Sequence, residues 1–234
     1  MREIIDDLQD MEAFIFDLDG VVYRTHELIP NADAIINEIK DHSIKVVFNS
    51  NNSTITREMY VERLTNFGID CEISDFYTSA YITAKEITKM KENATIYVIG
   101  EVGLREELKM LGHEVVKKPD RYEDVDFVIV GLDVHFRYSK LMIAQRCVLE
   151  GGAEFYATND DATLPAADGL MPGAGVMVNA LETCTGTPPE KVFGKPNPYG
   201  IELILRDHDL NPDKACIFGD RMETDILAGN RAGI

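Results

Sequence analysis

The chain has 234 residues, enough for one or two domains and for a sizeable buried core. Its 23 Lys and Arg residues against 41 Asp and Glu residues give a formal net charge of −18, which argues against a polynucleotide as partner because the two would repel each other. No stretch is apolar over the roughly 18 residues that a membrane span needs, and the first ten residues carry four acids and no apolar signal segment. The four cysteines lie far apart without a Cys-x-x-Cys pair, which favours reduced thiols. Together these features predict a cytoplasmic protein that binds neither nucleic acid nor membrane.

Four short apolar runs each end in small or charged polar residues. They are residues 13–20 (AFIFDLDG), 44–53 (IKVVFNSNNS), 192–198 (VFGKPNP) and 215–221 (ACIFGDR). Helical apolar spacing follows the first run at residues 35–39, the second at residues 56–67 and the fourth at residues 224–231. Apolar strands that alternate with amphipathic helices predict an α/β fold with a Rossmann-like, doubly wound parallel sheet. Such sheets bind ligands beyond the carboxyl ends of their strands, where all four polar clusters are expected to fall.

About 140 residues separate the second and third runs, and they contain an alternation of their own. Strands are predicted at 96–100, 114–116, 126–132 and 154–159, and helices at 103–111 and 138–149. The polar stretch 89–94 and the turn-rich stretch 185–190 are suited to linkers. We therefore expect the core in two parts, residues 1–90 and 188–234, with an inserted α/β cap domain over residues 91–187.

Two acids, Asp17 and Asp19, follow the first predicted strand. Side chains at positions i and i+2 can point to the same side, and two like charges held so close are costly unless a cation joins them or one keeps a proton. An isolated Asp-x-Asp pair is more often a solvated loop. Here a Phe-Ile-Phe run precedes the pair and Gly20 permits a tight turn, which places both acids at the sheet edge and favours a catalytic or metal-binding role.

Further charged residues follow the third and fourth runs. Asp220 lies near the end of the fourth run and Asp225 comes five residues later, and oxygen-rich sites of this kind suit Mg²⁺. Asp225 alone is better explained as an acid at a helix N-terminus, so Asp220 has the better claim to the metal. Lys195 lies between Gly194 and Pro196, where an ammonium beside carboxylates has a clear use with a phosphoryl group.

Polar uncharged residues end the second run. Ser50, Asn51 and Asn52 offer a hydroxyl, side-chain amides and backbone N–H groups to a ligand. A turn or a helix cap is an equally good explanation for Asn52.

These clusters occur in the order FDLDGVVY, VVFNSNNST, GKPNP and GDRMETDI, and as a set they resemble the four motifs of the haloacid dehalogenase superfamily of aspartate-nucleophile phosphatases. The insert, with GLREEL, ATNDDATLP and PGAG, resembles the type-two cap of the NagD-like, p-nitrophenylphosphatase-like and phosphoglycolate phosphatase-like branch. The resemblance covers nearly the whole chain. It also implies that the core should continue past Ile234 into another strand, so that either the chain is shortened or the core lacks an edge element.

The resemblance implies a role for each acid. Asp17 would attack phosphorus to form an aspartyl-phosphate, while Asp19 would protonate the leaving oxygen and then activate water. Asp220 would hold Mg²⁺ together with Asp17 and the main-chain carbonyl of Asp19, and Asp225 would act in the outer shell. Because Asp19 must be protonated during the attack, we expect surroundings that raise its pKa.

The resemblance also implies the phosphate-binding residues and the substrate class. Ser50 and Asn51 would bind the phosphoryl oxygens and Lys195 would neutralise their charge. The expected activity is Mg²⁺-dependent hydrolysis of small phosphate monoesters, such as phosphoglycolate, sugar phosphates, nucleoside monophosphates or p-nitrophenyl phosphate.

Substrate choice is expected to lie in the cap, in the loop 159–165 and the glycine-rich segment 172–175, with Leu164 near the leaving group. Pyridoxal-phosphate-preferring relatives carry a histidine at the Leu164 position, which disfavours that substrate here. In similar proteins dimers form through the cap, so a homodimer is a candidate assembly. Two alternatives stay open: a phosphotransferase or mutase of the same superfamily, and a non-catalytic protein that binds phosphate ligands.

Overall fold

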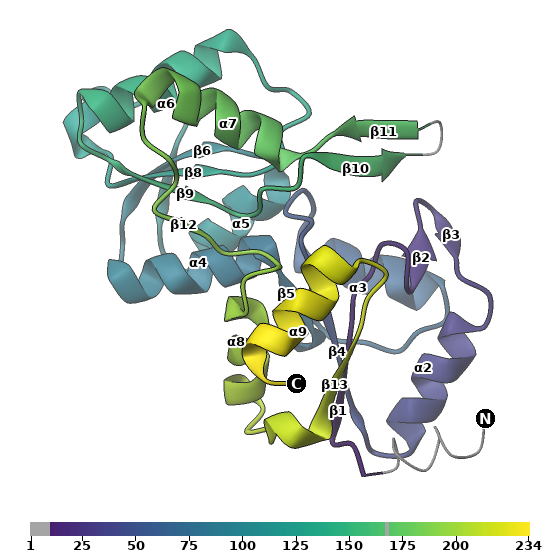
Figure 1. The fold of residues 1–234 in the computed structure, drawn as a ribbon. Coiled ribbons are helices and arrows are strands. Elements are labelled where there is room, and N and C mark those ends of the chain that lie inside the picture. The colour runs from purple at the N-terminus through teal and green to yellow at the C-terminus, as the bar shows by residue number, and fades with distance from the viewer. Residues whose placement is uncertain (1–9, 167–168) are drawn as a thin grey trace. The chain divides into compact units, whose positions relative to one another are not determined.

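The structure, a computed structural model, describes residues 10–166 and 169–234. Residues 1–9, on which the prediction of no secretory signal mainly rests, lie outside the described residues. The chain divides into two compact units (Figure 1), of which the first comprises the chain up to Ser50, residues 57–78 and residues 195–234, and the second comprises residues 51–56 and 79–194. Within the described residues, no helix is both long and apolar enough to cross a membrane.

The first unit contains a parallel sheet in the order β13-β1-β4-β5. Its strands are β1 (Ala13–Phe16), β4 (Lys45–Ser50), β5 (Phe76–Thr78) and β13 (Ala215–Phe218). All four residues of β1 are buried, as expected for a central strand covered on both faces. The predicted parallel α/β fold is thus confirmed.

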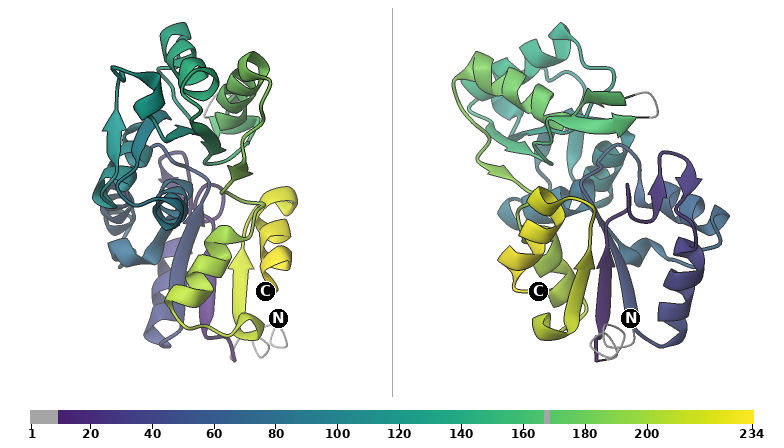
Figure 2. Two further views of the ribbon diagram at one scale, coloured as in Figure 1. Left: turned by 90° about the vertical axis from the view of Figure 1, so that its left-hand side faces the viewer. Right: turned by 45° about the vertical axis from the view of Figure 1, so that its right-hand side comes forward.

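The helices of the first unit cover both faces of this sheet (Figure 2). They are α2 (Ala32–Asp41), α3 (Arg57–Asn66), α8 (Tyr199–Asp207) and α9 (Leu227–Ala232), and a short antiparallel hairpin of β2 (Tyr23–Arg24) and β3 (Glu27–Leu28) follows β1. The chain runs from β1 to β4 and β5 in one direction and later returns to β13 on the other side of β1. The strand order therefore reverses between β1 and β13. Right-handed crossovers place the helices of the two directions on opposite faces of the sheet. A ligand site is therefore expected at the carboxyl ends of these two strands.

The second unit contains a five-stranded parallel sheet in the order β12-β9-β8-β6-β7. Its strands are β6 (Thr95–Ile99), β7 (Glu114–Val116), β8 (Phe127–Val130), β9 (Glu154–Ala157) and β12 (Lys191–Val192). Its helices are α4 (Ser79–Met90), α5 (Val102–Met110), α6 (Tyr138–Leu149) and α7 (Ala174–Thr185), and β10 (Thr163–Ala166) and β11 (Gly169–Pro172) form an antiparallel hairpin. Helices α4 and α5 pack together on one face and α6 and α7 on the other.

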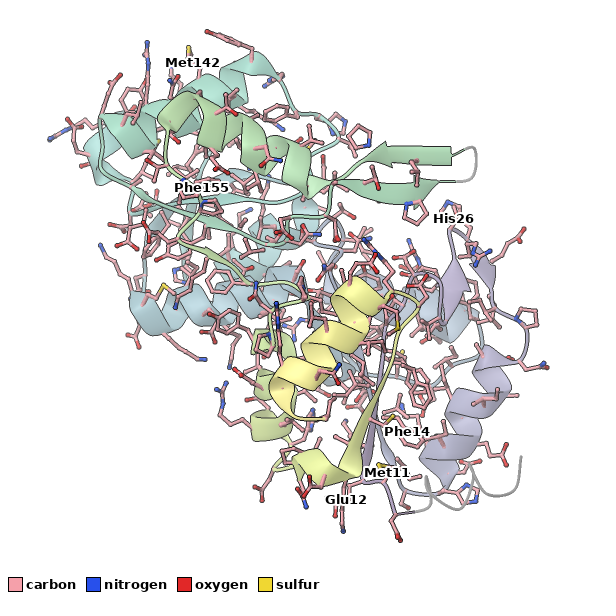
Figure 3. The ribbon with its side chains drawn as sticks, in the orientation of Figure 1. Met11, Glu12, Phe14, His26, Met142 and Phe155 are labelled. Carbon is pink, nitrogen blue, oxygen red and sulfur yellow. The ribbon has the colours of Figure 1, made fainter. Side chains whose placement is uncertain are left out.

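Each unit has its own buried core. The side chains of Phe14 in the first unit and Phe155 in the second lie inside their units (Figure 3). Each of the four strands and two helices predicted for the insert is present within two residues of its predicted limits. The inserted segment therefore folds around a sheet of its own.

The structure corrects the assignment of the third apolar run. Its strand β12 pairs with β9 in the second unit, and so it is not a strand of the first sheet. It is only two residues long. The fourth strand of the first sheet is instead β5, whose three residues are too few to show a pattern in the sequence.

The limits of the compact units also differ from the expected domain limits at residues 90 and 187. Helix α4 belongs to the second unit, because it packs against α5. The second unit continues to Gly194, since β12 completes its sheet.

Candidate active site

The turn after β1 positions the first acid. The Asp17 amide donates a hydrogen bond of 2.8 Å to the Phe218 carbonyl, so Asp17 continues the pairing of β1 with β13. The chain then turns at Gly20, whose φ of 94° favours glycine. A Cβ atom on Gly20 would also lie 2.2 Å from Oδ2 of Asp220. Glycine therefore serves both the turn and the close approach of the Asp220 carboxylate.

Lys195 joins two carboxylates in the interior of the first unit. Its Nζ atom donates hydrogen bonds to Oδ1 of Asp17 at 2.6 Å, to Oδ1 of Asp225 at 2.5 Å and to the Asn49 carbonyl at 2.9 Å. Lys195 is 5% exposed, Asp17 8% and Asp225 1%, so water screens these charges little. All three N–H donors of the ammonium are thereby used.

Asp225 is held by its own segment as well as by Lys195. It lies in a turn of π-helix over Met222–Ile226, and its Oδ2 accepts hydrogen bonds from the Arg221 amide at 3.2 Å and the Thr224 hydroxyl at 3.4 Å. A Cβ atom on Gly219 would lie 2.1 Å from the Asp225 Cβ, so only glycine leaves room for this packing. With both oxygens bonded to the protein, Asp225 is suited to supporting Lys195.

The surroundings of Asp19 agree with the expectation for a general acid. Burial raises the pKa of Asp19, and the nearby charge of Arg63 opposes this effect. The Tyr23 hydroxyl lies 3.5 Å from Oδ2 of Asp19 as a hydrogen-bond donor.

Three carboxylates of the first unit could hold a metal ion. Asp17, Asp220 and Asp225 each offer an oxygen, and these atoms all lie within 4.8 Å of one another. Clustered carboxylate oxygens are the ligands that Mg²⁺ prefers. Because Asp225 is already bonded on both oxygens, Asp17 and Asp220 are the better placed ligands, and the donor set fits the expected cation.

The pKa of Asp17 leads to a stability prediction. Burial raises it from the ordinary value of 3.8 to about 6, against the opposing charge of Lys195 and with a contribution from Asp225. The protonated carboxyl therefore stabilises the folded protein below pH 3.8, and this stabilisation is lost as the pH rises through about 6. In EDTA, the free energy of unfolding of Asp17→Asn should rise relative to wild type between pH 4 and pH 7, by about 3 kcal/mol. Thermal denaturation across this range measures the difference in the free energy of unfolding between Asp17→Asn and wild type. A difference that does not change with pH would contradict the prediction.

The structure divides the polar residues that follow β4 between the two units. Ser50 is buried at the end of β4 in the first unit, whereas Asn51 and Asn52 belong to the second. Asn51 donates from Nδ2 to Oδ2 of Asp161 at 3.0 Å. Oδ1 of Asn52 accepts hydrogen bonds from the amide of Thr54 at 2.9 Å and its hydroxyl at 2.7 Å, which is the turn considered as the alternative for this residue.

The two cap segments predicted to choose the substrate pack against each other within the second unit. Gly173 and Gly175 begin α7, and a Cβ atom on them would lie 2.1 Å from the Asp161 carbonyl and 2.4 Å from the Asp160 carbonyl, respectively. Glycine therefore brings the start of α7 against the loop that follows β9. Leu164 lies on β10, half-buried and paired with Met171.

Four predicted residues therefore lie together in the first unit: Asp17, Asp220, Asp225 and Lys195. Two neighbours of Asp19 were not predicted, Tyr23 and Arg63. The signal for Arg63 was its place three residues after Tyr60, on the face of α3 that apolar spacing marks as buried.

Comparisons with known proteins agree with this architecture. A family profile described as haloacid dehalogenase-like hydrolase matches residues 14–114, and a second, described as HAD-hydrolase-like, matches residues 192–234. The acid sugar phosphatase of Staphylococcus haemolyticus is 34% identical over 227 residues, which cover 97% of this chain and 84% of that protein. The 5'-nucleotidase YutF of Bacillus subtilis is 32% identical over 228 residues, which cover 97% of this chain and 86% of that protein.

Among solved structures, the p-nitrophenyl phosphatase from Archaeoglobus fulgidus matches with a TM-score of 0.89 and 33% identity, covering 96% of this chain and 84% of that one. The chain therefore belongs to the haloacid dehalogenase superfamily of hydrolases. Within that superfamily it is a phosphatase of the NagD and p-nitrophenylphosphatase type, a hydrolase that acts on phosphate monoesters.

Proposed function

We propose that the protein hydrolyses small phosphate monoesters in a Mg²⁺-dependent reaction that proceeds through a phosphorylated Asp17. The observation that carries the proposal is the placement of the Asp17 carboxylate at the carboxyl end of β1, bonded to the buried Lys195 and clustered with Asp220. Phosphate monoester hydrolysis is among the slowest uncatalysed reactions, with enzymatic accelerations of up to ~10²¹. Such a reaction requires both charge neutralisation and division into two steps.

In the first step a carboxylate oxygen of Asp17 attacks phosphorus, and the bond between phosphorus and the ester oxygen breaks. Asp19 gives its proton to that oxygen, so the leaving group departs as an alcohol. Burial favours the protonated form of Asp19 that this step needs.

In the second step Asp19, now a carboxylate, takes a proton from water as the water oxygen attacks phosphorus. The bond between phosphorus and Asp17 breaks, which releases phosphate and restores the Asp17 carboxylate. One residue thus acts as acid and then as base, and the opposing effects of burial and of Arg63 on the pKa of Asp19 suit both roles.

The remaining residues bind charge. Asp17, Asp220 and the main-chain carbonyl of Asp19 would hold Mg²⁺, which when bound neutralises negative charge between the attacking carboxylate and the phosphoryl group. Lys195 neutralises negative charge on the phosphoryl oxygens, and Asp225 holds the Lys195 ammonium in place through a hydrogen bond. Ser50 and Asn51 are proposed to donate hydrogen bonds to the same oxygens.

The substrate is proposed to be a small phosphorylated metabolite, namely phosphoglycolate, a sugar phosphate or a nucleoside monophosphate, with p-nitrophenyl phosphate as a synthetic substrate. The named relatives act on sugar phosphates, nucleotides and p-nitrophenyl phosphate, which supports this range. Leu164 and the hairpin that carries it are proposed to contact the leaving group.

The cytoplasm is proposed as the compartment, because all four cysteines are free thiols. A homodimer through the second unit is proposed as the assembly on the resemblance to similar proteins.

The test is phosphate release from a panel of these esters in Mg²⁺ or in EDTA. Release in Mg²⁺ that EDTA abolishes supports the proposal, and the order of the rates identifies the leaving groups that the enzyme accepts. Addition of an acceptor alcohol distinguishes hydrolysis from phosphoryl transfer, since transfer yields a new ester in place of phosphate. No release of phosphate from any ester by the folded protein would refute the proposal.

Asp220→Asn should raise the Mg²⁺ concentration needed for half-maximal activity by at least about tenfold, because an amide is a weaker ligand than a carboxylate. Titration of the initial rate with Mg²⁺ measures this change. Glu223→Gln is the matched control, since Glu223 is an exposed acid of the same segment that pairs with Arg221, and its Mg²⁺ requirement should equal that of wild type. An unchanged requirement in Asp220→Asn would remove Asp220 from the metal site.

A further inference from the structure

Helix α3 places the half-buried Arg63 beside the buried Tyr60 and Leu64 of its inner face, which begins with the buried Arg57. Tyr60, Leu64 and Phe67 share the i, i+4, i+7 spacing of that face, and Arg63 occupies the i+3 position among them. Its guanidinium carbon lies 5.1 Å from the centre of the Tyr23 ring and 6.0 Å from the centre of the Tyr60 ring. Both rings are fully buried, so the cation contacts their faces where water screens it little.

Tyr23 connects this cation with the active site. It begins the β2–β3 hairpin, and its amide donates to the Leu18 carbonyl at 3.2 Å, which anchors the backbone beside the acid pair. Its hydroxyl lies 3.5 Å from Oδ2 of Asp19 as a donor. Phe67, the residue that follows α3, lies 6.1 Å from the same ring between centroids, so Arg63 and Phe67 both pack against the Tyr23 ring.

We propose that Arg63 is a positioning residue: it fixes the Tyr23 ring, and the Tyr23 hydroxyl in turn fixes the side chain of Asp19 for proton transfer to the leaving group. The inference rests on the proposed function. In this arrangement Tyr23 bonds Oδ2 of Asp19, and the other oxygen, Oδ1, would give its proton to the ester. Proton transfer requires donor and acceptor within hydrogen-bond reach, so a loosely held Asp19 would meet the leaving oxygen less often.

The leaving group determines how much such positioning matters. p-Nitrophenolate is a stable anion that departs with little need of a proton, whereas phenolate is more basic and gains more from an acid. The two phosphate esters differ only by the nitro group, so they present nearly the same shape to the rest of the site. The ratio of their kcat/KM values therefore reports on proton donation, because kcat/KM includes only the steps up to departure of the leaving group.

The experiment compares these two esters in Mg²⁺ with wild type, Tyr23→Phe, Arg63→Met and Arg63→Lys. Tyr23→Phe keeps the ring and removes the hydroxyl, and methionine is a good helix former without charge. For Tyr23→Phe and Arg63→Met we expect kcat/KM for phenyl phosphate to fall by about tenfold more than kcat/KM for p-nitrophenyl phosphate, a fraction of what general acid catalysis supplies. Arg63→Lys keeps a cation over the ring and should restore most of the ratio.

Arg24→Met is the matched control, because Arg24 is an exposed cation that neighbours Tyr23 on the same strand. Circular dichroism establishes that each variant is folded. An equal fall for both esters, a rise in KM alone or unchanged kinetics would each overturn the inference while phosphate release by wild type upholds the proposed function. Absence of release by wild type would overturn both.

Discussion

Asp17→Asn is expected to lower phosphate release by at least about 10⁴-fold, the scale of loss seen when an enzyme nucleophile is removed. An amide oxygen is a far weaker nucleophile than a carboxylate, so the bond to phosphorus cannot form. The fold should survive, because burial raises the pKa of Asp17 and the site therefore disfavours the charge that the substitution removes. Initial rates in saturating Mg²⁺, with thermal denaturation of the same sample, give both results.

The matched control for this variant is Asp41→Asn, the same chemical change at an exposed position at the end of α2. Its rate should equal that of wild type. Substantial activity in Asp17→Asn would exclude a phosphorylated Asp17, and the second step would then need another route. Trapping of phosphate on the wild-type protein, detected by mass spectrometry of acid-quenched samples, provides an independent measure of the intermediate.

Lys195→Ala is expected to affect stability and activity together. It leaves the buried carboxylates of Asp17 and Asp225 without their cation, and loss of one partner of a buried ion pair costs about 3–5 kcal/mol of folding free energy. It also removes the positive charge proposed to meet the phosphoryl oxygens, which should lower kcat/KM by about 10²-fold or more even in saturating Mg²⁺. Chemical denaturation and steady-state kinetics measure the two effects separately.

Lys214→Ala is the control for Lys195→Ala. Lys214 forms a solvent-exposed pair with Glu12 in the same unit, and loss of an exposed pair should leave both stability and activity close to those of wild type. If Lys195→Ala is destabilised but retains full activity in Mg²⁺, Lys195 is a structural residue only.

The sequence predicted the parts of the fold that have long apolar patterns. Strands β1 and β8 are continuous buried runs and β6 and β9 are nearly so, and α6 has the predicted limits because its apolar spacing continues over twelve residues. The hairpins β2–β3 and β10–β11 were not predicted, since two to four residues per strand give no periodicity. The third apolar run was assigned to the wrong sheet, because apolar character shows that a strand is buried but not which neighbour it pairs with.

The acids and the lysine of the site were predicted because charged side chains directly after apolar runs stand out in the sequence. Asp17, Asp220 and Lys195 follow strand ends, and parallel sheets bind ligands at the carboxyl ends of their strands, so the three were expected to lie together. Tyr23 and Arg63 were not predicted, because an aromatic residue just after a turn and an arginine on a helix are common and indicate no particular function. Their significance depends on contacts between segments forty residues apart, which no local pattern encodes.

The discontinuity of the first unit has a consequence for biosynthesis. Strands β1, β4 and β5 leave the ribosome early and can pair with one another, but β13, the other neighbour of β1, is made only after the whole second unit. Lys195 likewise follows Asp17 by 178 residues, so Asp17 lacks this buried cation while the second unit is being translated. A nascent chain therefore holds one open edge of β1, and Asp17, Lys195 and Asp220 can come together only after the residues that follow the second unit have emerged.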